Sequence, residues 1–248
     1  PGVVAGGSRR VSRRFYCPEL QPTTGDLTLA GNEGRHLAVV LRAAPGDRVI
    51  LFNGRGLQAD GTVRRVDSLG VQIEITAHLP ASAQHRRVVT LATAVPKGDR
   101  FDWLVEKATE LGVARVVPLV TSRSVVEPRD TRLEKLRRVI VEASKQCGRA
   151  DLLDLAPLTR VSALLSESFP EGSVWVAHPG GGELPEVAPM WPAAVTFLIG
   201  PEGGWTEQEV AAAAARGAGV MSLGPRLLRI ETAGLALAAV ACSGLTQG

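Results

Sequence analysis

The pattern of hydrophobic and polar positions changes near residue 80. Before it, residues 14–78 alternate between apolar and polar positions in short runs that are separated by glycine-containing turns. A period of two residues is typical of strands with one buried face, so this segment predicts a small antiparallel sheet or barrel with one short helix near residues 33–43. Residues 79–86 are mostly small and polar and include a proline, which predicts a linker. The alternating runs occupy residues 48–53, 59–66 and 71–76.

From residue 87 onward, short apolar runs alternate with segments of helical character. An apolar run without alternation is typical of a strand that is buried on both faces. Glycines and capping-box patterns mark the ends of the intervening helices. Residues 87–248 therefore predict an α/β domain with a mostly parallel sheet covered by helices on both faces. We expect strands at residues 88–94, 115–120, 174–178, 195–199 and 220–223, helix starts at Asp99, Thr131, Thr206 and Thr232, and helix ends near Gly112, Gly148, Gly217 and Leu245.

The net charge of +3 conceals an asymmetry along the chain. Residues 84–150 carry 14 basic and 8 acidic side chains, whereas residues 151–248 carry 4 basic and 10 acidic ones. A basic segment beside an acidic one indicates a polyanionic partner for the basic segment. Solvated helix faces whose charges pair with neighbours explain the same composition, so charge alone leaves both interpretations open.

Composition disfavours several classes of protein. Residues 1–13 are rich in arginine but lack the apolar core of a secretory signal, and we interpret them as a flexible basic tail. The longest apolar stretch, at residues 235–242, is too short to span a membrane. The three cysteines are far apart and odd in number, and no metal-ligand spacing is present. We therefore expect a cytoplasmic protein with no membrane partner and no metal.

Two glycine-containing segments near the C-terminus carry most of the functional information. Residues 198–204 (Leu-Ile-Gly-Pro-Glu-Gly-Gly) and residues 223–229 (Leu-Gly-Pro-Arg-Leu-Leu-Arg) each follow a predicted strand and precede a predicted helix. In a parallel sheet both segments would lie at the carboxyl edge, where open α/β sheets bind ligands. Arg226, Arg229 and Glu231 lie in an otherwise apolar tract, where charges are costly unless they are paired or used.

Other familiar site patterns are weaker. The dinucleotide-like pattern at residues 54–59 follows one strand but precedes another, so a hairpin turn explains it better than a cofactor site. Cys147 lies between Lys145 and Arg149, yet no base is positioned for it, and a structural cysteine is favoured. The four histidines are scattered and show no metal spacing. His178 ends a predicted strand just before three glycines and is expected at the same edge as the two glycine-containing segments.

Five segments together resemble the bacterial RsmE family of 16S ribosomal RNA methyltransferases, which act on uridine N3 and belong to the SPOUT superfamily. The resemblance covers about residues 14–245 and keeps the order of the family motifs. The chain departs from the family at Ile230, where many members have threonine, and in its N-terminal tail. The matching segments are Pro-Lys-Gly-Asp-Arg at 96–100, Glu-Lys-Ala-Thr-Glu-Leu-Gly at 106–112, Gln-Cys-Gly-Arg at 146–149, Ile-Gly-Pro-Glu-Gly-Gly at 199–204, and Leu-Gly-Pro-Arg-Leu-Leu-Arg at 223–229 followed by Glu-Thr-Ala at 231–233.

The resemblance implies a PUA-like β-barrel RNA-binding domain at residues 14–78 and a SPOUT methyltransferase domain with a deep trefoil knot at residues 87–248. It also implies a homodimer, and S-adenosylmethionine as the cofactor, held largely by the two glycine-containing segments. The expected cofactor-binding residues are Leu198, Ile199, Gly200, Pro201, Gly203, Leu223, Gly224, Leu227, Leu228, Arg229, Thr232 and Ala233.

Methylation of uracil N3 requires that its proton leave, and the resulting anion spreads its charge onto O2 and O4. A fixed guanidinium is suited to stabilise that anion. Arg229 is the first candidate, and Arg149, reaching across the dimer, is the second. Glu202 is the candidate base or orients Arg229, although a carboxylate there would equally complement the dipole of the following helix. Glu231 is an alternative partner for Arg229, and water is an alternative proton acceptor.

RNA binding is expected from the basic segment and the N-terminal domain, with 16S ribosomal RNA or the small ribosomal subunit as the partner. Phosphate contacts give affinity and salt dependence more than sequence choice. The target uridine must be accessible or extruded because N3 lies on its pairing edge. The candidate phosphate contacts are Arg86, Arg87, Lys97, Arg100, Arg123, Arg132, Lys145 and Arg149.

Three functions stay open at this point. The favoured one is an RNA methyltransferase. A non-catalytic RNA-binding ribosome assembly factor on the same fold would bind RNA without methyl transfer. A nucleotide-utilising α/β enzyme acting on a small molecule would be active without RNA.

Overall fold

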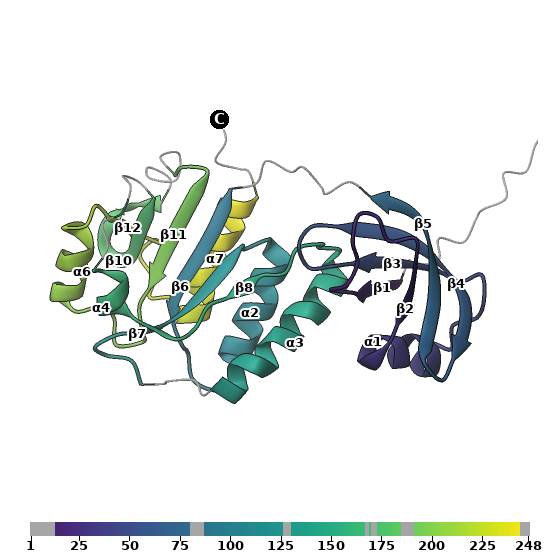
Figure 1. Ribbon diagram of the computed structural model, residues 1–248. Coiled ribbons are helices and arrows are strands. Elements are labelled where there is room, and N and C mark those ends of the chain that lie inside the picture. Colours follow the sequence, from purple (N-terminus) through teal and green to yellow (C-terminus); the bar gives the residue numbers. More distant parts are fainter. Residues whose placement is uncertain are drawn as a thin grey trace, which may run out of the picture. The chain divides into compact units, whose positions relative to one another are not determined.

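The computed structural model describes residues 13–79, 87–125, 130–166, 169, 173–184 and 191–243. The chain divides into two compact units, Pro1–Ala83 and Gln84–Gly248, and each is described by itself (Figure 1). Arg86 of the predicted RNA-binding set lies outside the described residues, as does nearly all of the predicted tail and linker. Arg13, which we assigned to the tail, is the first residue of a strand.

The N-terminal unit contains a five-stranded sheet in the order β1-β3-β4-β5-β2. Its core is formed by the inward positions of the alternating runs, such as Leu51, Val63 and Ile73. The predicted sheet is confirmed, but it is not purely antiparallel, because β1 pairs with β3 in parallel. The elements are β1 (Arg13–Tyr16), β2 (Asp26–Leu29), α1 (Gly31–Arg35), the π-helical turn η1 (His36–Val40), β3 (Arg48–Phe52), β4 (Gln58–Asp67) and β5 (Gly70–Leu79).

The single helix that we predicted near residues 33–43 is wrong in its ends. It begins earlier, as α1, and widens into η1, where the Leu41 N–H donates to the His36 carbonyl. The chain then leaves the helix at Arg42, which has φ 50°, and the Ala43 N–H closes the turn on the Leu37 carbonyl. A left-handed residue cannot continue a right-handed helix, so the helix stops at this point.

The C-terminal unit contains a sheet in the order β12-β10-β11-β6-β7-β8, and every recorded strand pair in it is parallel. A further strand, β9, also pairs with β7 in parallel. The elements are β6 (Val88–Ala94), α2 (Arg100–Leu111), β7 (Arg115–Val120), α3 (Asp130–Cys147), β8 (Asp154–Leu155), β9 (Thr159–Arg160), α4 (Val161–Leu164), β10 (Val174–Glu183), β11 (Ala194–Ile199), α6 (Glu207–Ala214), β12 (Gly219–Ser222) and α7 (Ile230–Cys242).

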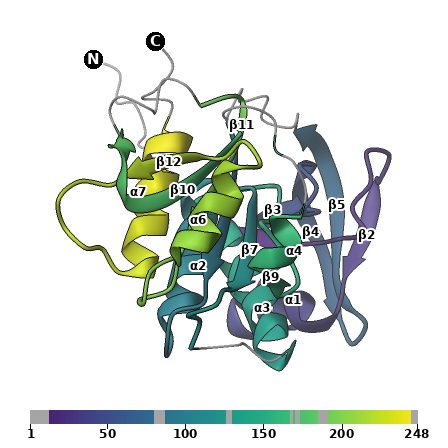
Figure 2. The same cartoon turned by 90° about the vertical axis from the view of Figure 1, so that its left-hand side faces the viewer.

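Helices cover both faces of this sheet, as predicted (Figure 2). One hydrophobic cluster joins the strands to α2, α3 and α7 through residues such as Leu104, Leu136 and Leu237. A second cluster joins them to α4 and α6 through residues such as Val161 and Ala213. Because apolar side chains of the strands point into both clusters, the strands read as continuous apolar runs in the sequence.

The helix ends follow the predicted signals only in part. Gly112 caps α2 in the left-handed conformation, and Thr206 with Glu209 forms a complete capping box before α6. Asp99 occupies the N-cap position of α2, but its side chain makes no capping hydrogen bond. Thr131 lies inside α3, which begins at Asp130, so the predicted cap there is wrong.

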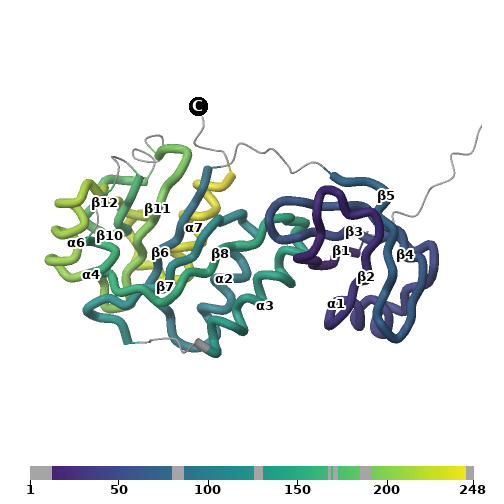
Figure 3. Tube along the Cα trace, in the orientation of Figure 1, coloured from purple at the N-terminus to yellow at the C-terminus, as the bar shows by residue number. Residues whose placement is uncertain are grey.

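The strand order places β12, β10 and β11 side by side, with their carboxyl ends toward one edge of the sheet. After β6 the chain builds β7 and β8 on one side, and then returns so that β11 lies beside β6 with β10 and β12 beyond it (Figure 3). This reversal of strand order is the kind of point at which open parallel sheets bind ligands. The glycine-containing segments that follow β11 and β12 lie at this edge.

Strand β10 extends beyond the predicted end at His178. Both Ala177 and Gly182 are aligned with Met221 of β12, so the intervening residues form an irregular step in the register. A Cβ at Gly181 would lie 2.3 Å from the Met221 backbone nitrogen, a distance that real Cβ atoms do not reach. Glycine is therefore required where this segment crosses β12.

Candidate functional site

A cavity of about 370 Å³ lies at the carboxyl ends of β10, β11 and β12, and we call it the first cavity. It is lined by residues 177–179 of β10, by the segments that follow β11 and β12, by Arg123 and by the start of α7. Its residues are Arg123, Ala177, His178, Pro179, Ile199, Gly200, Pro201, Glu202, Gly204, Trp205, Ser222, Leu223, Gly224, Arg226, Leu227, Leu228, Ile230 and Ala233.

The first glycine loop, residues 200–205, is closely packed. A Cβ at Gly200 would lie 2.9 Å from the indole nitrogen of Trp205, so the aromatic ring rests directly on the glycine backbone. Gly204 has φ 70° and donates its N–H to the Pro201 carbonyl, which closes a tight turn. Trp205 is buried, and its indole nitrogen has no hydrogen-bond partner among the residues that the structure describes.

Two polar side chains fasten this loop to the rest of the sheet. One guanidinium nitrogen of Arg123 donates to the Gly203 carbonyl at 2.8 Å and to the Trp205 carbonyl at 3.4 Å. The buried carboxylate of Glu209 accepts from the N–H of Thr206 and from the N–H of Ser122. Burial tends to raise the pKa of Glu209, but these hydrogen bonds outweigh it and hold the pKa below its ordinary value.

The second glycine loop, residues 223–229, is open by comparison. Gly224 has φ 99°, and its N–H approaches the Ser222 hydroxyl at 3.3 Å. Leu227 is 90% exposed, and Arg229, also exposed, is the N-cap residue of α7. Within the described residues, the Arg229 side chain makes no hydrogen bond or ion pair. The loop thus presents apolar and cationic groups without fixing them to the sheet.

A second pocket, of about 700 Å³, adjoins the first cavity and shares Leu227 and Leu228 with it. Glu231 lies in its lining with a side chain only 8% exposed. The Arg100 guanidinium lies 3.8 Å from Glu231 Oε1. The lining residues are Asp99, Arg100, Trp103, Leu227, Leu228, Arg229, Glu231 and Thr232.

Two parts of the chain match known protein families. Residues 83–242 match the RNA methyltransferase domain family, and residues 29–76 match the RNA methyltransferase PUA domain family. The ribosomal RNA small subunit methyltransferase E of Synechocystis is 33% identical over 235 residues, which cover 89% of this chain and 74% of the relative. The chain belongs to the ribosomal RNA small subunit methyltransferase E family. The Bacillus subtilis member is 29% identical and is covered over 88% of its length, with 86% of this chain aligned.

Two solved structures similar to this chain contain the cofactor that the resemblance implies. The small subunit methyltransferase E of Neisseria gonorrhoeae, bound to S-adenosyl methionine, has a TM-score of 0.82 at 29% identity, covering 94% of this chain and 98% of its own. A putative methyltransferase of Legionella pneumophila, in complex with the same cofactor, has a TM-score of 0.83 at 29% identity, with the same coverage. The predicted family and its α/β fold with an N-terminal PUA domain are thereby confirmed.

The structure brings together most of the residues predicted from the family resemblance to bind the cofactor. Leu198 is instead buried in the core, and Gly203 is exposed next to the Arg123 side chain. Arg229 and Thr232 line the second pocket. The predicted residues that line the first cavity are Ile199, Gly200, Pro201, Leu223, Gly224, Leu227, Leu228 and Ala233, together with the candidate base Glu202.

Sequence reasoning missed part of the first cavity. His178 lines it, as its position before three glycines indicated, but we did not expect Ala177 and Pro179 beside it. Arg123 was predicted as a phosphate contact and lies in the cavity lining instead. Ile230, where the resemblance led us to expect threonine, is buried and lines the cavity with an apolar side chain.

Arg149 is not brought to the site within the chain. Its guanidinium donates to the carbonyls of Thr109 and Val113 and pairs with Asp151 at 2.8 Å. These carbonyls precede β7, so Arg149 lies at the amino edge of the sheet, opposite the first cavity. Within this unit it holds the end of α2, and its catalytic role across a dimer stays a prediction.

Arg87 was predicted to contact RNA phosphates, and the structure corrects this. The residue is 8% exposed, and its guanidinium donates to the carbonyls of Trp191, Pro192 and Ala241. A guanidinium enclosed in this way joins β6 to α7 and is not available to a polyanion.

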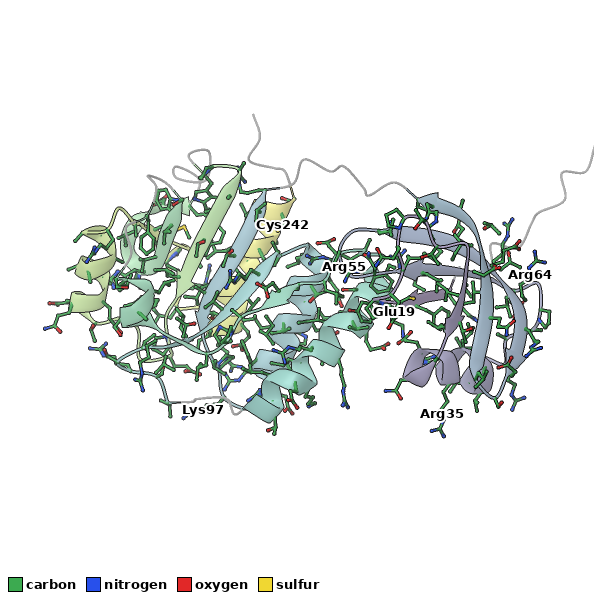
Figure 4. The ribbon with its side chains drawn as sticks, in the orientation of Figure 1. Glu19, Arg35, Arg55, Arg64, Lys97 and Cys242 are labelled. Atoms are coloured by element: carbon green, nitrogen blue, oxygen red, sulfur yellow. The ribbon has the colours of Figure 1, made fainter. Side chains whose placement is uncertain are left out.

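The remaining candidates for phosphate contact differ in whether their side chains already form ion pairs within the protein. Arg132 pairs with Asp102 at 2.8 Å, and Lys145 pairs with Glu142 and is only 11% exposed. Lys97, in contrast, is exposed after β6, and its side chain has no partner among the described residues (Figure 4). Lys97 and the partly exposed Arg100 therefore stay the best candidates of this set for contact with RNA.

In the part of the chain that the structure describes, no group of three or more histidine, cysteine or acidic side chains could hold a metal ion. No helix in that part is long and apolar enough to cross a membrane.

Proposed function

We propose that the protein transfers a methyl group from S-adenosylmethionine to N3 of a uridine in the 16S ribosomal RNA of the small subunit. The observation that carries the proposal is the first cavity, built from glycine backbone at the carboxyl edge of a parallel sheet in a member of an RNA methyltransferase family. The names of its relatives refer to ribosomal RNA of the small subunit, and two solved relatives bind the cofactor.

The residues of the first cavity fit the cofactor. Its volume of about 370 Å³ lies within the range of small-molecule sites, roughly 300–1,000 Å³. Gly200 and Gly224 allow close approach of backbone, and Leu223, Leu228 and Ala233 provide an apolar wall. Arg226 and Glu202 add one charge of each sign, which suits a ligand that carries an ammonium, a carboxylate and a sulfonium. When bound, the cofactor supplies an already activated methyl group.

The protein must then prepare the base rather than the donor. Uracil N3 is a poor nucleophile while it carries its proton, and removal of the proton leaves an anion whose charge lies on O2, N3 and O4. The guanidinium of Arg229, at the start of α7, has no partner among the residues that the structure describes and is available to stabilise that charge. Preorganised cations at the position where charge develops are the largest catalytic contribution in many enzymes.

RNA would be held by both units of the chain. Residues 29–76 match the RNA methyltransferase PUA domain family, and the exposed Lys97 and partly exposed Arg100 lie in the other unit. Contacts of this kind make affinity fall as salt rises. The trefoil knot, the homodimer, the cytoplasmic location, the flexible tail at residues 1–13 and the linker at residues 79–86 stay predictions.

Methyl transfer from labelled S-adenosylmethionine to small ribosomal subunits that lack the modification tests the proposal. Nucleoside analysis of the product is expected to place the label in 3-methyluridine. Label in another nucleoside would remove the N3 assignment. RNA binding without cofactor binding in calorimetry, and without transfer, would favour the non-catalytic assembly factor instead.

A further inference from the structure

The second pocket contains a buried acid without a complete set of partners. Glu231 Oε2 is buried and has no hydrogen-bond partner among the described residues. Its other oxygen lies 3.8 Å from the Arg100 guanidinium, which is beyond hydrogen-bond distance. A buried carboxylate oxygen without a donor is costly, so such an atom indicates a ligand that supplies one.

The place of Glu231 in the fold suits an anionic side chain. It lies in the first turn of α7, a helix of 13 residues, where the helix dipole favours a negative charge. Arg229, the N-cap residue of the same helix, lines the same pocket and is unpaired in the described part of the chain. The pocket therefore presents a carboxylate together with two guanidinium groups, those of Arg100 and Arg229.

This set of groups complements the pairing edge of uracil. That edge presents an acceptor, a donor and an acceptor in the order O4, N3–H, O2. Two guanidinium groups donate and a carboxylate accepts, which is the complementary composition. Cytosine presents a bare N3 acceptor and an amino donor on the same edge, so it would leave Glu231 facing a lone pair.

Trp103 provides a surface for the face of a base. It belongs to α2, lines the second pocket and is 48% exposed, whereas Trp175, Trp191 and Trp205 are buried. Exposed aromatic rings are the usual stacking platforms for extruded or single-stranded bases. The sequence contains few aromatic residues, so an exposed tryptophan in this position is informative.

We propose that the second pocket receives the target uracil and that Glu231 is the acceptor of its N3 proton. The inference rests on the proposed function and assigns the base to Glu231 in place of Glu202, which lines the first cavity. In the step, the N3–H bond breaks, its electron pair stays on the ring, and the proton is bound by the carboxylate. The ring becomes an anion held by Arg100 and Arg229, and Glu231 becomes neutral.

The first cavity and the second pocket adjoin each other, which supports this assignment. They share Leu227 and Leu228, so a base in the second pocket lies beside the ligand of the first cavity. Leu227 is 90% exposed and is available to pack against a base that enters. The second glycine loop thus separates the first cavity from the second pocket, and the methyl group would pass from one to the other across it.

A binding experiment without a methyl donor tests the pocket by itself. The full-length protein is titrated with uridine 5′-monophosphate, 3-methyluridine 5′-monophosphate and cytidine 5′-monophosphate, and tryptophan fluorescence is followed. We expect uridine to bind about tenfold or more tightly than the other two, because a lost or mismatched buried hydrogen bond has a cost of that order. The fluorescence change is expected to vanish in Trp103→Phe. Equal affinity for the three nucleotides would overturn the proposal.

A pH profile of methyl transfer tests the role of Glu231. Glu231→Gln is expected to lose about 100-fold or more in rate near neutral pH, the usual contribution of a general base. Its rate should then rise about tenfold per pH unit as hydroxide removes the N3 proton, more steeply than in the wild type. Glu142→Gln, on the exposed side of α3, is the matched control and should behave as the wild type.

The outcomes separate this inference from the proposed function. A wild-type protein that transfers no methyl group to ribosomal RNA removes the proposed function. An active wild type whose Glu231→Gln variant keeps its rate and its pH profile overturns the inference alone. If Glu231→Gln fails to bind the cofactor, the variants Arg100→Gln and Trp103→Ala test the inference instead, through their binding of uridine and 3-methyluridine 5′-monophosphates. Unchanged preference for uridine over 3-methyluridine in both variants would then overturn the inference.

Discussion

The two glycine-containing loops of the first cavity are built in opposite ways. Residues 200–205 are fastened by Arg123 and by the Thr206–Glu209 capping box. Residues 224–229 are exposed, and Leu227 and Arg229 project from them without partners in the described part of the chain. The fastened loop is suited to hold a small ligand in a fixed place, because its order is already present before binding. The open loop is suited to meet a large substrate that arrives later.

The largest effect is expected from the open loop. Arg229→Lys should keep cofactor affinity but lose about 100-fold in turnover, because lysine lacks the planar pair of donors that an extended anion needs. Calorimetry with the cofactor and single-turnover methylation separate the two quantities. Arg216→Lys, an exposed substitution at the end of α6, is the control. Near-normal turnover of Arg229→Lys would remove Arg229 from catalysis.

The fastened loop should instead respond through stability. Glu209→Ala removes the capping box and the acceptor of the Ser122 N–H, and we expect unfolding in urea to show a loss of about 2 kcal/mol. Cofactor affinity should fall with it. Glu207→Ala, in the same helical turn, is the control, and a loss as large as that of Glu209→Ala would show that the fastening is not specific.

Glu209 is also expected to make the stability of the protein depend on pH. Because hydrogen bonds lower the pKa of Glu209 in the folded protein, its stabilising contribution is fully present above the pKa of the unfolded chain. It is lost as the pH falls through the lower, folded pKa. The stability difference between the wild type and Glu209→Ala should therefore shrink when the pH drops below the ordinary value of 4.5. A difference that grows on acidification would contradict this.

A smaller effect is expected where the fastened loop meets its aromatic support. Gly200→Ala places a methyl group 2.9 Å from the Trp205 indole nitrogen, so the ring must shift by a few tenths of an ångström. We expect cofactor affinity to fall about tenfold, since small displacements in a preformed site are costly. Gly25→Ala, where the added Cβ meets nothing within 4 Å, should leave affinity unchanged.

The smallest effect is expected for the stability contribution of the open loop. Leu227→Ser changes a side chain that is 90% exposed, so the free energy of unfolding should stay within about 0.5 kcal/mol of the wild type. Uridine binding in the second pocket should nevertheless weaken, because Leu227 lines it. A marked loss of stability would show that the loop is as closely fastened as residues 200–205.

The sequence by itself determined the features that depend on neighbouring residues. Alternation predicted β3, β4 and β5, continuous apolar runs predicted the strands of the second sheet, and the Thr206–Glu209 spacing predicted a capping box that the structure contains. The two glycine loops were placed correctly at one sheet edge, because all carboxyl ends of a parallel sheet meet there. The short strands β1 and β2 were missed because four residues are too few to show a period.

Only the tertiary structure decided what each charged side chain does. Arg87, Arg123 and Arg149 look alike in the sequence, yet one is enclosed by three carbonyls, one fastens residues 200–205 and one holds the end of α2. The pairing of Arg100 with Glu231 was equally invisible, because it joins α2 to α7. A local pattern is set by residues a few positions apart, whereas the partner of a guanidinium is set by whichever carbonyls and carboxylates the fold brings within reach.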